Sequence, residues 1–268
     1  MDIQVSYKTR KSHFYNEDRY IIFDKVFMVL DGATPLKKSG IKPTSASWFA
    51  NFVKTNLPKQ RGTVLQRLEQ VSQKAYKWLK DNNLHNDLPT AGIAWAEVCN
   101  DHINVYSIGD CEVTVVAKDK KLCRVVGNQL INLDKIAIDK IKQICEQQGV
   151  SPLQARKQIN PLLLKHRNMA NKPGGYPVFA PDPVGKFEFL HKVFDLSQVD
   201  EVYIYTDGFA DGFDCLGVFE NHAQAFAQSI DVCEQVEKIT KACFDDPQCK
   251  KHPRFKKIDD ITIIKLKF

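Results

Sequence analysis

Two features are missing from this sequence: long hydrophobic runs and closely spaced cysteine pairs. No stretch of the 268 residues approaches the roughly 20 apolar residues that a membrane-spanning helix needs. Residues 1–7 alternate apolar and polar side chains as a strand does, and they do not resemble a signal peptide. We therefore expect a cytoplasmic protein that has no membrane partner.

The 8 cysteines are dispersed along the chain, and none belongs to a C-x-x-C pair. This spacing argues against a zinc ribbon and against thiol redox chemistry. We expect most of these thiols to be reduced, and only an oxidising setting would favour a bond between Cys243 and Cys249.

Concentrated charge is missing as well, because the net charge of +6 is spread along the chain. Three short basic runs stand out, and a nucleic-acid surface would require aromatic residues interleaved with them on one face. We interpret the runs as solvated surface, and contact of one run with an anionic substrate is the alternative. These runs are residues 118–121, 165–167 and 250–257. The composition, 43% hydrophobic and 26% charged, is that of a folded domain. We expect one domain over residues 1–268, a monomer, and no nucleic-acid partner.

The most informative stretch is the apolar run Val26 to Leu30, which stops at Asp31-Gly32. Five consecutive apolar residues favour a strand that is buried on both faces. A carboxylate beside a core is unfavourable unless it is paired, hydrogen-bonded or bound to a cation. Asp-Gly taken alone is also a common hairpin turn.

The pattern recurs in distant parts of the chain. Two more apolar runs end at aspartate beside glycine, and two acidic pairs adjoin predicted strands. These segments are 102–110, 201–208, Asn16-Glu17-Asp18 and Asp259-Asp260. Carboxylates that converge with little sulfur or imidazole form the ligand set that Mg²⁺ and Mn²⁺ prefer. Two such ions can activate a water for phosphoryl hydrolysis.

In this order the motifs resemble those of the metal-dependent serine/threonine protein phosphatases of type 2C, the PPM family, and its bacterial members in particular. The five segments that carry the resemblance are Asn16-Glu17-Asp18, Val29-Leu30-Asp31-Gly32, Ile108-Gly109-Asp110, Thr206-Asp207-Gly208-Phe209-Ala210-Asp211 and Asp259-Asp260-Ile261-Thr262. The resemblance extends from residue 16 to the end of the chain. It implies an α+β fold, a four-layer α-β-β-α sandwich of two mainly antiparallel sheets flanked by helices, with the metals at one end.

The resemblance also implies roles for the acids. Asp31 is the expected bridging ligand, and the carbonyl of Gly32 completes the shell of one metal. Asp207 and Asp259 are expected to bind the same ion. For Asp259 the alternative is that the acidic pair only charges the start of an edge strand.

A second set of acids is expected to act around this centre. Glu17 would bind the second metal, and Asp18 would orient metal-bound water. Asp110 and Asp211 match carboxylates that hold a third ion in bacterial relatives. A Gly-Asp hairpin turn is the alternative for Asp110.

The sequence departs from the family pattern at two positions. The family usually has an arginine that binds the phosphate, four residues before the glutamate of the acidic pair. In this chain that glutamate is Glu17, and the position before it is His13. His13 is therefore the first candidate for phosphate binding, followed by Arg10 and then Lys11. Many members also place a histidine, the proposed general acid, after Asp-Gly, where this chain has Ala33. The leaving group would then be protonated by water, by His13 or not at all.

Hydrophobic periodicity predicts the remaining elements. The predicted strands are 3–7, 19–24, 26–30, 90–99, 102–108, 111–116, 121–126, 186–194, 201–206 and 259–268. The predicted helices are 45–57, 64–79, 133–148, 152–168, 221–230 and 232–244. The four strands between residues 90 and 126 look like one antiparallel meander. The helices within about 130–170 form an apparent insert, which Pro161 should break or kink.

These observations predict a Mn²⁺- or Mg²⁺-dependent phosphomonoester hydrolase with two metal ions and an optional third. The resemblance implies phosphoserine or phosphothreonine in proteins as the substrate, which a partner kinase would phosphorylate. One alternative is a pseudophosphatase, a binding module that keeps the fold without activity. The other is a small-molecule phosphatase whose pocket is reshaped by the helical insert.

Overall fold

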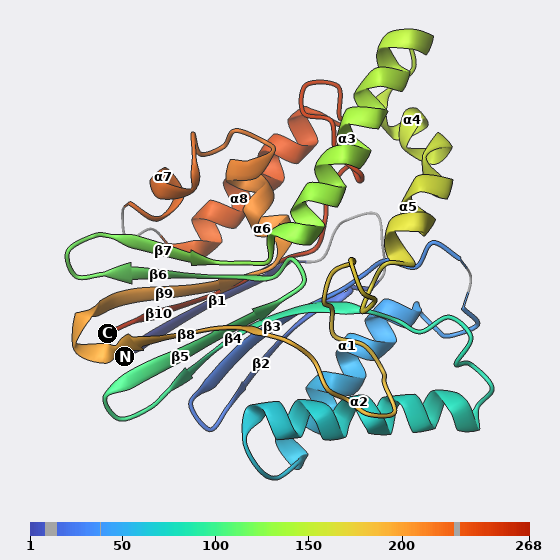
Figure 1. The fold of residues 1–268 in the computed structure, drawn as a ribbon. Helices are drawn as coiled ribbons and strands as arrows, with labels where there is room; N and C mark the ends of the chain where they lie inside the picture. Colours follow the sequence, from blue (N-terminus) through green and yellow to red (C-terminus); the bar gives the residue numbers. More distant parts are fainter. Residues whose placement is uncertain (9–14, 38, 228–230) are drawn as a thin grey trace.

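Two five-stranded antiparallel sheets form the middle of the molecule (Figure 1). The structure is a computed structural model that describes residues 1–8, 15–37, 39–227 and 231–268. In spatial order, the first sheet consists of β1 (Asp2–Lys8), β10 (Ile261–Lys267), β9 (Val199–Tyr205), β6 (Glu112–Ala117) and β7 (Leu122–Val125). The second consists of β2 (Asp18–Phe23), β3 (Val26–Gly32), β4 (Ala91–Val98), β5 (His102–Ile108) and β8 (Leu190–Asp195).

The run of apolar residues in β3 is explained by burial on both faces of the strand. Phe27 and Val29 pack into the core between the sheets. Met28 and Leu30 alternate with them and pack against the helices on the outer face. The strand is reached through a tight hairpin in which Asp24 and Lys25 both have positive φ angles, 50° and 76°.

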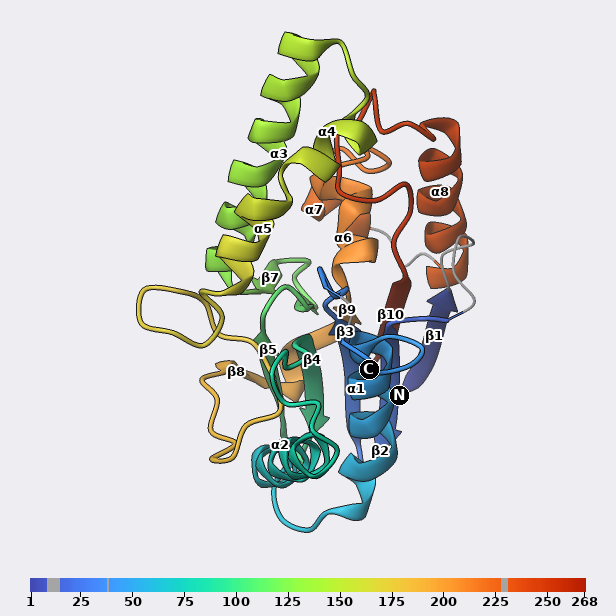
Figure 2. The same cartoon turned by 90° about the vertical axis from the view of Figure 1, so that its right-hand side faces the viewer.

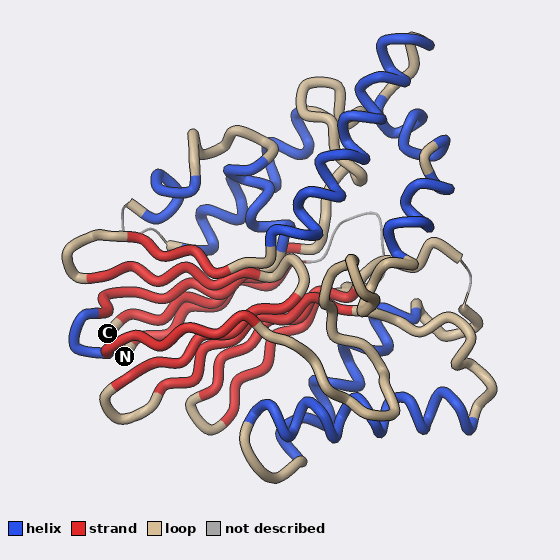
Figure 3. The backbone as a smooth tube through the Cα atoms, viewed as in Figure 1, coloured by secondary structure: helices blue, strands red, loops and turns tan. Residues whose placement is uncertain are grey.

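Helices cover the outer face of each sheet (Figure 3). Next to the second sheet lie α1 (Ser45–Asn56), the 3₁₀ helix η1 (Leu57–Lys59) and α2 (Val64–Asp81). Next to the first lie α6 (Asp207–Asp214), α7 (His222–Phe226) and α8 (Val232–Asp245). A second 3₁₀ helix, η2 (Leu196–Gln198), joins β8 to β9. This four-layer arrangement confirms the predicted fold class.

The remaining helices are α3 (Asn128–Gln148), α4 (Pro152–Gln158) and α5 (Asn160–Arg167). They rise from one end of the sandwich (Figure 2), and we call them the helical roof. They share a small hydrophobic cluster of their own, centred on Ala137, Ile141, Ala155 and Ile159. The predicted break is confirmed, since Pro161 lies in the first turn of a new helix.

The predicted four-strand meander is wrong. β4 and β5 belong to one sheet, whereas β6 and β7 belong to the other. The chain crosses between the sheets at Gly109-Asp110, where Gly109 has a φ of +77°. The alternation of apolar and polar residues predicted these strands correctly, but it does not specify which sheet a strand joins.

Sequence periodicity also missed helix α6. Its sequence contains two glycines and three aspartates, which are poor helix formers. It is helical because Phe209 and Phe213 pack beneath Tyr205 and α8 in the outer core.

Within the described ranges, no helix is long and apolar enough to cross a membrane.

Candidate metal and phosphate site

Asp31 lies at the end of β3 beside two neighbouring strands. It pairs in register with Asp18 of β2 on one side and with Gly92 of β4 on the other. A Cβ atom built on Gly92 would collide with the Asp110 carboxylate and lie 3.1 Å from the Cys111 sulfur. The missing side chain at Gly92 therefore lets Asp110 lie close to the bottom of the cavity.

Asp207 is the first residue of α6, separated from the end of β9 by Thr206 alone. The next residue, Gly208, packs so closely on the backbone carbonyl of Asp260 that a Cβ atom there would overlap it. This contact holds the start of α6 against the start of β10. Asp207 Oδ1 is buried and has no hydrogen-bond partner in the part of the chain that the structure describes.

Five of the predicted acids line two adjoining cavities of about 170 and 200 Å³. Asp110, Asp207 and Asp259 line both cavities, and Asp31 lines the first. We call Asp31, Asp110, Asp207 and Asp259 the acidic floor. Asp211, one turn along α6, lines the second cavity.

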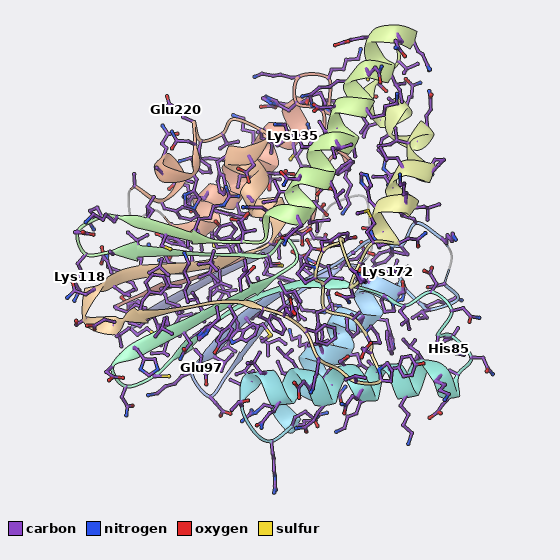
Figure 4. The ribbon with its side chains drawn as sticks, viewed as in Figure 1. His85, Glu97, Lys118, Lys135, Lys172 and Glu220 are labelled. Carbon is purple, nitrogen blue, oxygen red and sulfur yellow. The ribbon has the colours of Figure 1, made fainter. Side chains whose placement is uncertain are left out.

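The roof closes the other side of these cavities. Asp134 of α3 lines both of them, and Lys135, labelled in Figure 4, marks this part of the helix. Three polar residues of α4 and α5 also line the first cavity, namely Arg156, His166 and Arg167. Sequence analysis assigned none of these roof residues to the site, and it showed His166 and Arg167 only as part of the basic run 165–167. Their positions depend on how three helices pack.

The acids of the floor disturb one another's ionisation. Burial raises the pKa of Asp31 well above its usual range, and Asp207, Asp18 and Asp110 add to the effect by repulsion. Burial and the charge of Asp207 raise the pKa of Asp110 to about 8. The same two causes raise the pKa of Asp134 to about 7, although Arg167 and Lys256 oppose them. A nearby cation would stabilise the charged forms of these groups.

One protein cation already lies against this cluster. Lys256 Nζ is 2.7 and 2.8 Å from the two carboxylate oxygens of Asp259. Its charge lowers the pKa values of Asp110, Asp134, Asp207 and Asp211, against the larger effect of burial. This lysine was not predicted from the sequence, which showed it only as part of a basic run.

The carboxylate oxygens of the floor are the donors that a hard divalent cation prefers, but they are not arranged as a complete coordination shell. Among the described residues, no three histidine, cysteine, aspartate or glutamate side chains are arranged to hold one ion as they stand. Asp31 and Asp207 lie close enough that each carboxyl group shifts the pKa of the other. We give more weight to the oxygen-only donor set and to the unpartnered Asp207 Oδ1, because side-chain rotation can close a shell around fixed strand ends.

Glu17 and Asp18 are buried beneath this floor. The Glu17 carboxylate accepts hydrogen bonds from Thr34, at 2.5 Å, and from Thr44, at 2.8 Å. Asp18 Oδ2 accepts from the hydroxyls of Thr206, at 2.9 Å, and Thr262, at 2.8 Å. Asp18 is thus held by two threonines from the opposite sheet.

Two further predicted positions have clear structural constraints. A Cβ atom on Gly32 would lie 2.9 Å from the carbonyl oxygens of both Ala46 and Glu17, so only glycine fits there. Asp259 precedes β10, which lies between β1 and β9 and is not an edge strand. The edge-strand alternative for Asp259 is therefore wrong. The hairpin alternative for Asp110 is wrong as well, because the chain changes sheet at that residue.

Arg10, Lys11 and His13 lie outside the described residues, so their predicted phosphate contacts stay predictions. Ala33, which stands where many family members have histidine, lines the first cavity beside Thr34.

Similarity to solved structures settles the fold. Stp1 from Staphylococcus aureus, a serine/threonine phosphatase, superposes with a TM-score of 0.61 over 100% of this chain and 94% of its own, at 12% identity. The chain has the fold of the bacterial serine/threonine phosphatases.

Other phosphatases agree with this assignment. The catalytic domain of PstP, solved with two manganese ions, gives a TM-score of 0.58 over 98% of this chain and 96% of its own, at 10% identity. PppA of Pseudomonas aeruginosa gives 0.58 over 100% and 97%, at 12% identity. No protein-family model matches the sequence, and no curated protein matches it. At such low identity the likeness shows the phosphatase fold alone.

Proposed function

We propose that this protein is a metal-dependent phosphomonoester hydrolase that acts on phosphoserine or phosphothreonine in proteins. One observation carries the proposal. Asp31, Asp110, Asp207 and Asp259 come from four distant segments and meet at the cavities of a phosphatase fold. PstP, which shares this fold, was solved with two manganese ions.

The acidic floor would hold Mn²⁺ or Mg²⁺. Asp31, the Gly32 carbonyl, Asp207 and Asp259 would hold one ion, and Asp31 and Glu17 would hold a second. In the structure the Glu17 carboxylate is hydrogen-bonded to Thr34 and Thr44. Asp110, together with Asp211, would take a third ion. Ions of this kind supply charge neutralisation at the phosphate and an activated water.

The protein's own groups position the reactants. Asp18, fixed by Thr206 and Thr262, would orient the attacking water. The water oxygen forms a bond to phosphorus while the bond between phosphorus and the ester oxygen breaks. The departing oxygen then takes a proton from water or from His13, because Ala33 cannot donate one.

A binding module without activity is the second candidate. The observation that favours it is the ion pair between Lys256 and Asp259, which occupies an expected metal ligand. The departures at His13 and Ala33 point in the same direction. A small-molecule phosphatase is the third candidate, since the helical roof encloses the cavity.

One set of activity assays distinguishes the three candidate functions. The purified protein is stripped of metal and tested on p-nitrophenyl phosphate, a phosphothreonine peptide and a nucleoside monophosphate. The same assays are repeated with added Mn²⁺ and with added Mg²⁺. We expect metal-dependent hydrolysis of the phosphopeptide. Absence of turnover on every substrate would favour the binding module, and preference for the nucleotide would favour the small-molecule enzyme.

The same proposal implies a phosphoprotein partner and a kinase that phosphorylates it. We expect the hydrolase to work as a monomer, because all the proposed ligands come from one chain. Sedimentation with and without Mn²⁺ tests this expectation.

A further inference from the structure

Two arginines of the helical roof share the first cavity with the acidic floor. Arg156 comes from α4 and Arg167 from α5, and both line the cavity beside Asp31 and Asp207. The break before Pro161 turns α5 relative to α4, so that residues 11 positions apart reach one space. Figure 2 shows these short helices directly above the ends of the strands.

The two guanidinium groups are close enough to affect each other. Burial lowers the pKa of Arg156, and the charge of Arg167 lowers it further. Both side chains are half-buried. Two like charges held near each other at a half-buried site destabilise the empty protein unless an anion lies between them.

Neither arginine forms an ion pair with a carboxylate of the described residues, although the charge of Arg167 lowers the pKa of Asp134 across the cavity. Arg156 donates to the side-chain oxygen of Asn160, and Arg167 donates to the carbonyl oxygen of Thr34 at 3.4 Å. Both acceptors are neutral. Elsewhere in the fold, the half-buried Arg124 binds Glu112 and Asp214, and the buried Arg254 binds Asp246. The half-buried Arg19 donates, within the described residues, to neutral oxygens, but it does not line the cavity. What distinguishes Arg156 and Arg167 is that both line the cavity, where an anion could contact the two guanidinium groups together.

We propose that Arg156 and Arg167 bind the phosphate group of the substrate, in place of the arginine that His13 replaces. This inference rests on the proposed function and specifies how the same site recognises its substrate. A guanidinium group presents a planar fork that matches two phosphate oxygens. A metal ion at the acidic floor and the two guanidinium groups of the roof would contact the phosphate from opposite sides. The cavity would therefore select a phosphomonoester, whose phosphate has enough terminal oxygens for both contacts.

The proposal predicts a different pH response from phosphate binding by His13. Arginine stays protonated throughout the physiological range, whereas an unperturbed histidine loses its charge above a pKa of about 6.5. With the arginine pair, KM for a phosphopeptide should stay level between pH 7 and 9. With His13 as the main contact, KM should rise over the same range.

The test is the double variant R156Q/R167Q, with R156K/R167K as the conservative counterpart. We expect the glutamine variant to raise KM for a phosphothreonine peptide roughly 10- to 100-fold, as the loss of charged hydrogen bonds implies. The value of kcat at saturating Mn²⁺ should change by less than about threefold, and the lysine variant should recover part of the loss.

The chain offers a matched control. Lys157 and Lys165 lie on the same two short helices but are exposed. The variant K157Q/K165Q removes the same amount of positive charge from the roof, and its KM should equal that of the wild type. Thermal unfolding of each variant checks that the roof remains folded.

A second measurement does not depend on turnover. Inorganic phosphate is titrated calorimetrically into the wild type, into R156Q/R167Q and into K157Q/K165Q, each with and without Mn²⁺. Weaker phosphate binding by R156Q/R167Q than by K157Q/K165Q supports the arginine site even if the protein hydrolyses nothing. Equal phosphate affinity and equal KM in both double variants would overturn the site while leaving the proposed hydrolase intact. A KM that rises with pH and responds to H13Q alone would overturn it in favour of His13.

Discussion

The acidic floor and the helical roof face the same cavity but are built in opposite ways. The floor acids lie at strand ends whose positions are fixed by sheet register and by glycines that allow backbones to touch. The roof depends on a small hydrophobic cluster of its own, joined by Phe255 from the loop before β10. We infer that the floor fixes where chemistry occurs, whereas the roof sets how the substrate is held. The floor should therefore tolerate almost no change, and the roof should change affinity separately from metal binding.

The largest expected effect is that of Asp31→Asn at the centre of the floor. The substitution removes the charge that would attract two cations at once. We expect Mn²⁺-dependent turnover to fall by about 10³-fold or more, with weaker Mn²⁺ binding by calorimetry. Asp24→Asn, in the exposed hairpin at the far end of the same strand, is the control and should behave like the wild type. Near-normal activity of the Asp31 variant would contradict the binuclear proposal.

Gly32→Ala tests whether the floor is as closely packed as its geometry indicates. The added methyl group would lie 2.9 Å from two backbone carbonyl oxygens, and neither can move without shifting β2 or α1. We expect a loss of about 1 to 3 kcal/mol in the free energy of unfolding, measured by urea denaturation. Gly127→Ala is the control, because its φ is −77° and its nearest backbone contact is 3.2 Å. Equal stabilities for the two variants would show that the strand ends can relax.

Ile141→Ala tests the independence of the roof. Ile141 is fully buried in the roof cluster, and its truncation should weaken the local packing by about 2 to 4 kcal/mol. We expect KM for a phosphopeptide to rise about tenfold while Mn²⁺ affinity stays within twofold. Ile136→Ala removes the same atoms from an exposed position of the same helix and serves as the control. A parallel loss of Mn²⁺ affinity would mean that roof and floor are one unit.

The smallest expected effect is at Lys256, where the loop before β10 meets the floor. Its ion pair with Asp259 is partly exposed, so we assign it about 1 kcal/mol. Lys256→Gln should free Asp259 and tighten Mn²⁺ binding about fivefold, measured by calorimetry. Lys257→Gln, the exposed neighbour, should leave the affinity unchanged. Weaker Mn²⁺ binding in the Lys256 variant would mean that the lysine organises the site rather than competing for it.

Much of the floor could be predicted from the sequence because its elements are defined by local signals. An apolar run that ends near Asp-Gly predicts both a buried strand and an acid close to its end, as at Asp31 and Asp207. The α+β sandwich followed from the same apolar periods. The ligand roles of these acids remain predictions that the variants above test.

The sequence by itself determined the strands, their faces and the acids at their ends, since alternation and burial are encoded residue by residue. Only the tertiary structure decided that the chain changes sheets at Asp110 and that Asp134, Arg156 and Arg167 face the acids. A helix pattern specifies which side of the helix is buried, but it does not specify what lies opposite. That choice depends on packing between segments far apart in the chain. Here the packing places Arg156 and Arg167, which form no ion pair with the described residues, opposite the acidic floor.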